Sequence, residues 1–170
     1  LNLIPTDSSA SLTDVTFDDL HSDFSTGLQV LGWGESSFTC LRCSFTNSTA
    51  NHASAGATLS MTGGGSVSFV DSKFTYLSCE SLCSIYIVSW LTGPYLPVEL
   101  SNLTLEYNNA SSVSGIYLNG TNLNISATQI QASYNSAPMG SMLVTISDSL
   151  LNLADSQFTS NFPNIGPPVT

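Results

Sequence analysis

The sequence predicts an all-β fold, a right-handed parallel β-helix (a solenoid) of about six coils with about 28 residues per coil. Three observations predict this fold. An eight-residue pattern recurs at a spacing near 28 residues, apolar and polar residues alternate within the pattern, and hydroxyl and amide side chains supply most of the polarity.

The repeat consists of six aligned segments. They begin at Ala10, Phe38, Val67, Val98, Leu123 and Leu151, with spacings of 28, 29, 31, 25 and 28 residues. Positions 1, 3 and 8 are apolar in all six segments, and positions 2 and 7 are polar in all six. This alternation predicts a strand with one buried face. Position 5 is usually Asp or Asn and is expected to turn the chain. Position 8 is expected to begin a second short strand, with its side chain pointing into the core.

A third short strand is expected about 20 positions into each repeat. Its apolar-polar-apolar triplets are 28–30, 59–61, 85–87, 116–118 and 142–144, several of them preceded by glycine. A single coil cannot bury its own face, so the coils must stack, with equivalent residues about 4.8 Å apart. We therefore expect Phe17, Phe45 and Phe74 to form an internal aromatic stack. A β-sandwich is the rival fold, but its strands recur every 8–12 residues with tight hairpins.

The repeat divides the chain into three parts. Residues 1–9 are expected to form an N-terminal strand or connection, residues 10–161 the solenoid, and residues 162–170 a proline-rich linker or arm. No signal-peptide pattern begins at Leu1, so we expect a processed product or a fragment of a longer protein. We see no cap helix before Ala10, which leaves unpaired strand edges at both ends.

Composition excludes several functions. Charged residues are only 8% of the 170 residues, Lys and Arg number 2, and the net charge is −10. Binding to nucleic acid or to an anionic membrane surface requires clustered cations, so neither is expected. No apolar run is long enough to span a membrane. Ser and Thr number 47 and Asn 13, which suits an extracellular β protein.

A family resemblance rests on short motifs. Residues 105–108 and 158–161 resemble the FxxN element of polymorphic outer-membrane-type β-helix repeats, and residues 55–58 and 114–116 resemble their GGAI element. More broadly, residues 10–161 are similar to pectin-lyase-like β-helices. The resemblance implies a surface adhesin, a passenger domain, another surface protein or a polysaccharide-degrading enzyme, and it implies the fold more strongly than the function.

Acidic residues and a histidine cluster in one segment. Asp18, Asp19, His21 and Asp23 follow Asp14. Such groups can do acid–base chemistry or bind a cation. All of them lie on the first predicted coil, however, whereas a β-helix active site gathers side chains from several coils. We interpret the segment as a solvated acidic loop and expect no catalytic residue, no cofactor and no metal.

Four cysteines occur in two close pairs. Cys40 with Cys43, and Cys79 with Cys83, are expected to form local disulfides, since an even number of cysteines in an extracellular-type chain favours disulfides. Three pairings are possible. Buried free thiols and zinc ligation stay open as alternatives.

Surface modification and sugar contact are also predicted. The N-x-S/T sequons at Asn47, Asn102, Asn109, Asn119 and Asn124 are candidate N-glycosylation sites. Tyr86 and Tyr117 share one position in adjacent coils, point outward and should stack, as a candidate platform for a sugar ring or as a cross-strand pair.

The sequence therefore predicts a non-enzymatic, secreted or cell-surface structural or adhesive module that is glycosylated. It would build a surface layer or fibre, with its coil ends covered by other copies or by further parts of the same protein. The alternative function is a carbohydrate-binding or polysaccharide-degrading domain.

Overall fold

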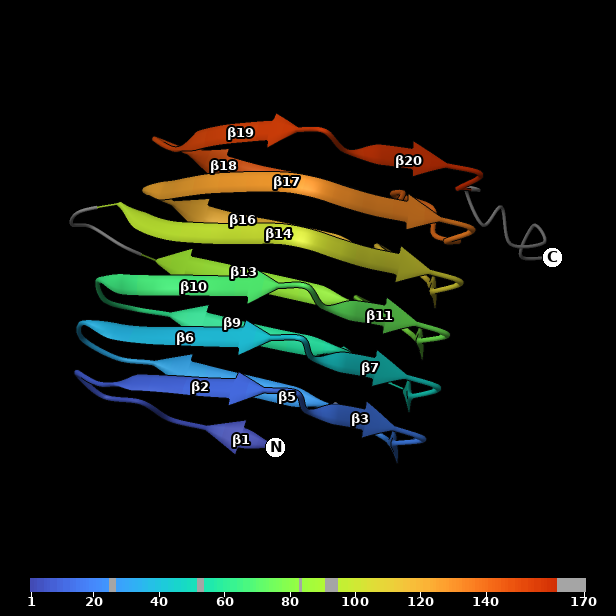
Figure 1. Cartoon of the computed structure of the whole chain (residues 1–170), viewed down its shortest axis with the longest axis horizontal. Coiled ribbons are helices and arrows are strands. Elements are labelled where there is room, and N and C mark those ends of the chain that lie inside the picture. Colours follow the sequence, from blue (N-terminus) through green and yellow to red (C-terminus); the bar gives the residue numbers. More distant parts are fainter. Residues whose placement is uncertain (25–26, 52–53, 83, 91–94, 162–170) are drawn as a thin grey trace, which may run out of the picture.

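The computed structural model describes residues 1–24, 27–51, 54–82, 84–90 and 95–161. In these residues every regular element is a β-strand, and the strands pair in parallel. The fold is a right-handed β-solenoid of about five turns, close to the six predicted. In Figure 1 the near strands run from left to right, the far strands run back, and the chain climbs from bottom to top. No described segment is a helix that could cross a membrane.

The far sheet in Figure 1, here called the back sheet, has six strands. In spatial order these are β1 (Asn2–Leu3), β5 (Leu28–Gly32), β9 (Ala57–Met61), β13 (Ile85–Trp90), β16 (Ile116–Thr121) and β18 (Met142–Ser147). Gly115 precedes β16 where two coils approach each other closely. A Cβ atom there would lie 2.1 Å from the carbonyl oxygen of Ser141, so only glycine fits.

The near sheet in Figure 1, here called the front sheet, has two halves separated by a bend. The first half contains β2 (Ser9–Thr13), β6 (Ser36–Leu41), β10 (Gly65–Val70) and β19 (Leu150–Ala154). The second half contains β3 (Thr16–Asp18), β7 (Ser44–Thr46), β11 (Lys73–Thr75) and β20 (Gln157–Thr159). The long strands β14 (Leu96–Glu106) and β17 (Leu123–Ser133) pass through both halves.

A short third sheet closes each turn. It contains β4 (His21–Ser22), β8 (Thr49–Ala50), β12 (Ser78–Cys79) and β15 (Asn109–Ala110). We number the stacked layers 1 to 6 by their front-sheet strands β2, β6, β10, β14, β17 and β19. A column is the set of residues that occupy one position in successive layers.

The bend in the front sheet is made by one residue per layer in the left-handed conformation. The φ angles there are 55° at Asp14, 52° at Arg42, 52° at Asp71, 50° at Asn102, 55° at Gln129 and 49° at Asp155. Asp and Asn tolerate this conformation better than most residues, which explains their frequency at position 5 of the repeat. The predicted turn is therefore confirmed.

The predicted core is continuous through the inner layers. Residues at positions 1, 3 and 8 of the second, third and fourth segments are all buried, as are Leu123, Ile125 and Ile130 of the fifth. The rings of Phe17, Phe45 and Phe74 stack with centroid separations of 4.6 Å and interplanar angles of 8° and 5°. The predicted internal aromatic stack is confirmed. Position 6, which the sequence pattern did not identify, also points inward, as at Cys43 and Leu103.

The register of two segments differs from the sequence alignment by two residues. Val98 pairs with Ile125 and Leu105 with Ala132, where the alignment placed Leu123 and Ile130. In the back sheet, Ala57 pairs with both Leu28 and Ile85, where the alignment placed Leu59. A strand shifted by two residues keeps the same side chains on the buried face, so alternation alone cannot distinguish these registers.

The two ends of the solenoid are less covered than its middle. In the last layer Leu151, Leu153 and Phe158 are 43%, 44% and 39% exposed, although their positions are inward. At the other end β1 pairs with β5. The expected proline-rich arm, residues 162–170, lies outside the described residues.

Candidate functional site

The acidic segment of layer 1 is tied to layer 2. Both carboxylate oxygens of Asp14 accept hydrogen bonds from Arg42, at 2.6 and 2.7 Å, and these bonds hold the pKa of Asp14 below its usual value. Asp18 accepts from Thr46 at 2.6 Å and from Asn47 at 3.1 Å, which lowers its pKa in the same way.

The other members of the segment have neighbours too. Nε2 of His21 lies 3.1 Å from Asp19, its Nδ1 lies 2.5 Å from the Thr49 hydroxyl, and Asp23 accepts from Asn51 at 2.9 Å. In the described part of the chain no group of three or more His, Cys, Asp or Glu side chains could hold a metal ion. The carboxylates therefore act mainly as hydrogen-bond acceptors between layers.

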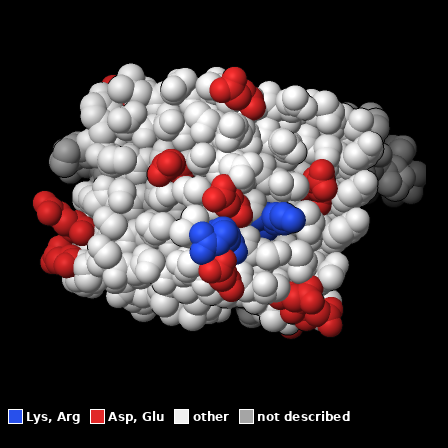
Figure 2. All heavy atoms as spheres, in the orientation of Figure 1, with Lys and Arg blue, Asp and Glu red and all other residues white. Residues whose placement is uncertain are grey.

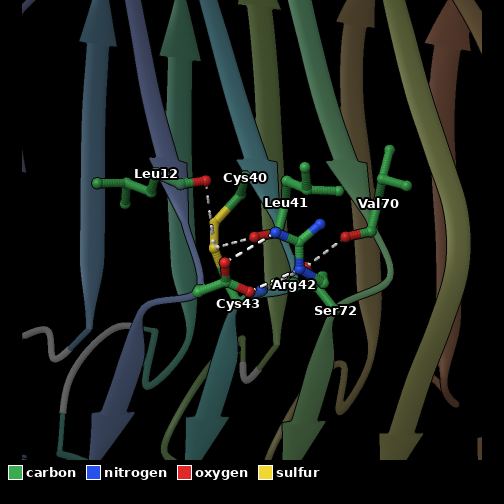
Figure 3. Close-up of a disulfide and its surroundings, with 8 residues drawn as sticks. Leu12, Cys40, Leu41, Arg42, Cys43, Val70 and Ser72 are labelled. Atoms are coloured by element: carbon green, nitrogen blue, oxygen red, sulfur yellow. Dashed lines mark hydrogen bonds and ion pairs between the residues drawn. A yellow bond between two sulfur atoms is a disulfide. The ribbon is translucent and has the colours of Figure 1, made fainter.

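Cys40 and Cys43 form a disulfide across the bend of layer 2, with their Cα atoms 6.0 Å apart. Both residues are buried in the core. Figure 3 shows the bridge beside the carbonyl oxygens of Leu12 and Leu41, with the Cys43 N–H donating to the Ser72 hydroxyl. Zinc ligation and free thiols are thus excluded for this pair. The predicted Cys79–Cys83 pair includes Cys83, which lies outside the described residues.

Four of the five sequon asparagines lie in strands, spread over the three sheets, and Asn47 lies between β7 and β8. Asn47 and Asn102 sit at left-handed bends and donate from Nδ2 to the carboxylates of Asp18 and Asp71, at 3.1 and 2.7 Å. Asn109 lies in the short sheet and Asn124 in the front sheet, and both are exposed. Asn119 lies in the back sheet, is half-buried, and forms a hydrogen bond with Tyr86.

The predicted stack of Tyr86 and Tyr117 is present, with ring centroids 5.3 Å apart and an interplanar angle of 12°. Burial raises the pKa of Tyr86. Each ring covers one face of the other, and both residues are half-buried. A sugar ring would therefore have to contact their outer edges or outer faces.

Sequence reasoning missed a longer tyrosine column. Tyr76, Tyr107 and Tyr134 stack in layers 3 to 5 with centroid separations of 5.0 Å and interplanar angles of 3° and 6°, and all three are exposed. Desolvation in the column raises the pKa of Tyr107, and the two neighbouring tyrosines add to this effect. Each tyrosine lies two residues after position 8 in the observed register, whereas the sequence alignment placed Tyr134 four residues after it.

An internal asparagine ladder runs beside the tyrosine column. Oδ1 of Asn108 accepts from the Leu77 N–H, that of Asn135 from the Asn108 N–H, and that of Asn161 from the Asn135 N–H, each at 3.0 Å. Their Nδ2 groups donate to carbonyl oxygens of the layer below, at Phe74, Leu105 and Ala132. The FxxN-like segments that were recognised in the sequence supply the first and last members of this ladder.

Charge is sparse on the face seen in Figure 2. Both cationic side chains lie near its middle, with single acidic side chains scattered around them. They can only be Arg42 and Lys73, the two cations of the chain. Because Arg42 is paired with Asp14, the face has no cationic patch that could bind a polyanion.

The last layer leaves a hollow of about 570 Å³ at the C-terminal end of the solenoid. We call this surface the open end, and its lining residues are Ser141, Met142, Val144, Leu151, Leu153, Phe158, Ser160 and Asn161. In the inner layers the equivalent side chains have another layer above them. The open end is thus an apolar hollow that no other described layer covers.

Comparison of the chain with protein-family models, with curated protein sequences and with solved structures found no match.

Proposed function

We propose that the chain is a non-enzymatic structural module of a secreted or cell-surface protein, stacked end to end in a surface layer or fibre. The neighbours that cover its ends are further coils of the same protein or other molecules. The open end is the single observation that carries this proposal.

At the open end the inward side chains of the last layer are partly exposed, and β18, β19 and β20 each have one unpaired edge. Burying such apolar side chains contributes about 25 cal/mol per Å² of apolar area removed from water. Unpaired edges are also templates for another strand. One more layer over the open end would bury these apolar side chains and pair these strand edges.

The lateral faces of the solenoid are where glycans would be attached. All five sequons belong to layers 2, 4 and 5, so glycans on them would project sideways and leave both ends clear. Attached glycans would oppose lateral aggregation and add solubility to a surface with few charges. This placement supports end-to-end assembly of a glycosylated module.

The geometry of the acidic segment supports a non-enzymatic role. A general acid or base needs a carboxyl group that is free to reach substrate. Both oxygens of Asp14 are occupied by Arg42, and Asp18 accepts two hydrogen bonds. The asparagine ladder supports the finer likeness to outer-membrane-type repeats, because it contains the asparagines of both FxxN-like segments.

Sedimentation velocity of the full chain tests the proposal. At 1 M salt, where charges are screened within about 3 Å, we expect concentration-dependent association through the ends. Leu151→Glu with Leu153→Glu should abolish this association. The matched lateral pair Asn124→Glu with Gln131→Glu, whose neighbours in the sheet are uncharged, should leave it unchanged. A chain that stays monomeric at millimolar concentration, or whose association responds only to the lateral pair, would overturn the proposal.

A second candidate function is carbohydrate binding, favoured by two exposed tryptophans. Trp33 and Trp90 are 53% and 64% exposed. The residues before them, Gly32 and Ser89, both pair with Met61, from opposite sides. The two tryptophans therefore lie at the same corner of the solenoid, two layers apart. Two layers span about 10 Å, and the Thr62 hydroxyl lies between them. Neutral oligosaccharides should then bind in titration calorimetry, and Trp33→Ala with Trp90→Ala should abolish the signal. The same heat from wild type and variant would remove this candidate.

A further inference from the structure

We propose that the open end receives a β-coil whose corners complement Asp148, Asp155 and Asn161, and that the first layer of a second copy binds there more weakly than this coil. The complementary coil has glycine above Asp148, a cation or amide donor above Asp155, and a hydroxyl or amide acceptor above Asn161. The inference rests on the proposed function, because it specifies what covers the open end.

Carboxylates at the corners of this solenoid accept hydrogen bonds from the layer above them. Asp14 accepts from Arg42, and Asp71 accepts from Asn102. Asp7 accepts from the backbone N–H of Glu35 at 2.9 Å. Gly34 leaves room for this bond, since a Cβ atom there would lie 1.9 Å from Oδ1 of Asp7.

Asp148 and Asp155 occupy the same two corners in the last layer. Asp7 and Asp148 have φ angles of 46° and 48° where the chain leaves the back sheet, and Asp14 and Asp155 have 55° and 49° at the bend of the front sheet. By the rule of the lower layers, both carboxylates of layer 6 need donors from a layer above. The described residues supply none.

Asn161 and Ser141 repeat this pattern inside the solenoid. Each lower ladder residue donates its backbone N–H to an asparagine of the layer above, and Asn161 is the last member. In the back sheet, Ser84 donates its hydroxyl to the Ser114 carbonyl of the layer above at 2.9 Å. Ser141 follows Gly140 at the equivalent position, is buried, and its hydroxyl has no partner among the described residues.

The first layer of a second copy does not fit these positions. Stacked in register, it would place Asp7 above Asp148, Asp14 above Asp155, and Leu20 above Asn161. The first two contacts bring carboxylates about 5 Å apart, and the third offers no acceptor to the Asn161 N–H. At the paired strand positions of the described layers, no acidic residue has another acidic residue as its partner.

Layer 2 shows the chemistry of a fitting coil. It places Gly34 above Asp7, Arg42 above Asp14, and the hydroxyl of Ser48 above Leu20, whose N–H it accepts at 3.2 Å. A coil with these three residues would offer partners to the carboxylates of Asp148 and Asp155 and to the backbone N–H of Asn161. The partner is therefore a β-coil of the layer 2 type in a further part of the same protein.

An insertion into the full chain tests the inference. A copy of residues 21–48 is placed between Asn161 and Phe162, so that its Gly34, Arg42 and Ser48 equivalents lie above Asp148, Asp155 and Asn161. The matched control carries the same copy with Gly34→Asp, Arg42→Asp and Ser48→Leu, which reproduces the corners of layer 1. We expect the folding equilibrium constant in urea titrations to be about tenfold higher with the layer 2 copy than with the control. Equal constants would overturn the inference.

Sedimentation at low salt provides the second measurement. Asp148→Asn with Asp155→Asn should raise the head-to-tail association constant about tenfold, and Glu99→Gln with Glu106→Gln, which removes the same charge from a lateral face, should not. If the wild type associates as strongly as the first variant, the inference fails while the proposed stacking function stands. If no variant associates and neither inserted coil stabilises the chain, the proposed function fails with it.

Discussion

The side chain of Asn135 accepts a hydrogen bond from the backbone N–H of Asn108 at 3.0 Å, and both residues are buried. The same side chain donates to the Leu105 carbonyl at 2.7 Å. One amide group thus satisfies two backbone groups of the layer below, in a region without solvent. The ladder joins layers 3 to 6 from inside, where the regular strand pairing is interrupted by a corner.

Replacing Asn135 with leucine should destabilise the fold strongly. The change leaves a buried N–H and a buried carbonyl without partners, each at a cost of about 1–3 kcal/mol. We expect the free energy of unfolding in urea to fall by about 2–5 kcal/mol. Asn124→Leu, at an exposed position of β17 in the same layer, should change it by only about 0.5 kcal/mol. Equal effects of the two substitutions would contradict a buried ladder.

The Cys40–Cys43 disulfide should be inaccessible in the folded protein. Both residues are buried, so reductant and alkylating reagent should label neither sulfur until the chain unfolds. Mass spectrometry after treatment with and without denaturant checks this. Cys40→Ala with Cys43→Ala should lower the free energy of unfolding by about 2 kcal/mol, the loop-entropy contribution of so short a loop. Rapid labelling under native conditions would place the bridge outside the core.

Acid should weaken the contact between layers 1 and 2. Hydrogen bonds from Arg42 lower the pKa of Asp14, and those from Thr46 and Asn47 lower the pKa of Asp18. A carboxyl group with a lower pKa in the folded state stabilises the fold fully above its unfolded pKa of about 3.9. That stabilisation is lost as the pH falls through the folded value.

The urea midpoint should therefore fall as the pH drops below about 4, and Asp14→Asn with Asp18→Asn should make this fall shallower. Unfolding curves recorded by circular dichroism at a series of pH values give the comparison. If the urea midpoint falls with pH equally in the wild type and the variant, the pKa values of Asp14 and Asp18 are not lowered by folding, and the prediction is wrong.

At least two of the five sequon asparagines should carry glycan when the chain passes through a eukaryotic secretory pathway. Asn109 and Asn124 are exposed, whereas Asn119 is half-buried and bonded to Tyr86, so occupancy should be lowest at Asn119. Intact mass before and after deglycosylation, followed by peptide mapping, measures each site. Unmodified peptides at all five positions would reject the modification.

Much of the fold could be predicted because the repeat carries the buried face in its alternation. The inward positions of Phe45, Phe69 and Phe74 follow from that pattern alone. The pairing of Val98 with Ile125 did not, because a shift of two residues buries the same side chains. Loop length decides this register, and nothing in the alternation reports how much chain each corner needs.

The candidate surfaces were less predictable than the fold. The Tyr86–Tyr117 stack followed from equivalent places in two coils, but the tyrosine column was hidden because its members fall on a corner with no apolar pattern. The layer-to-layer role of Asp14 was also hidden, since Arg42 lies 28 residues away in the sequence. Only the stacking of layers brings these residues together.

The arguments above depend on which residue lies above which, and disulfide trapping between layers 4 and 5 tests this most directly. Glu99 pairs with Ser126 in the structure, whereas the sequence alignment places Asn124 beside it. Neighbouring outward residues about 5 Å apart can be bridged, whereas a pair offset by two residues cannot. We predict that Glu99→Cys with Ser126→Cys forms a disulfide on mild oxidation, as should the undisputed pair Ser68→Cys with Glu99→Cys, and that Glu99→Cys with Asn124→Cys does not. Preferential bridging of the Asn124 pair would contradict the register and every column argument built on it.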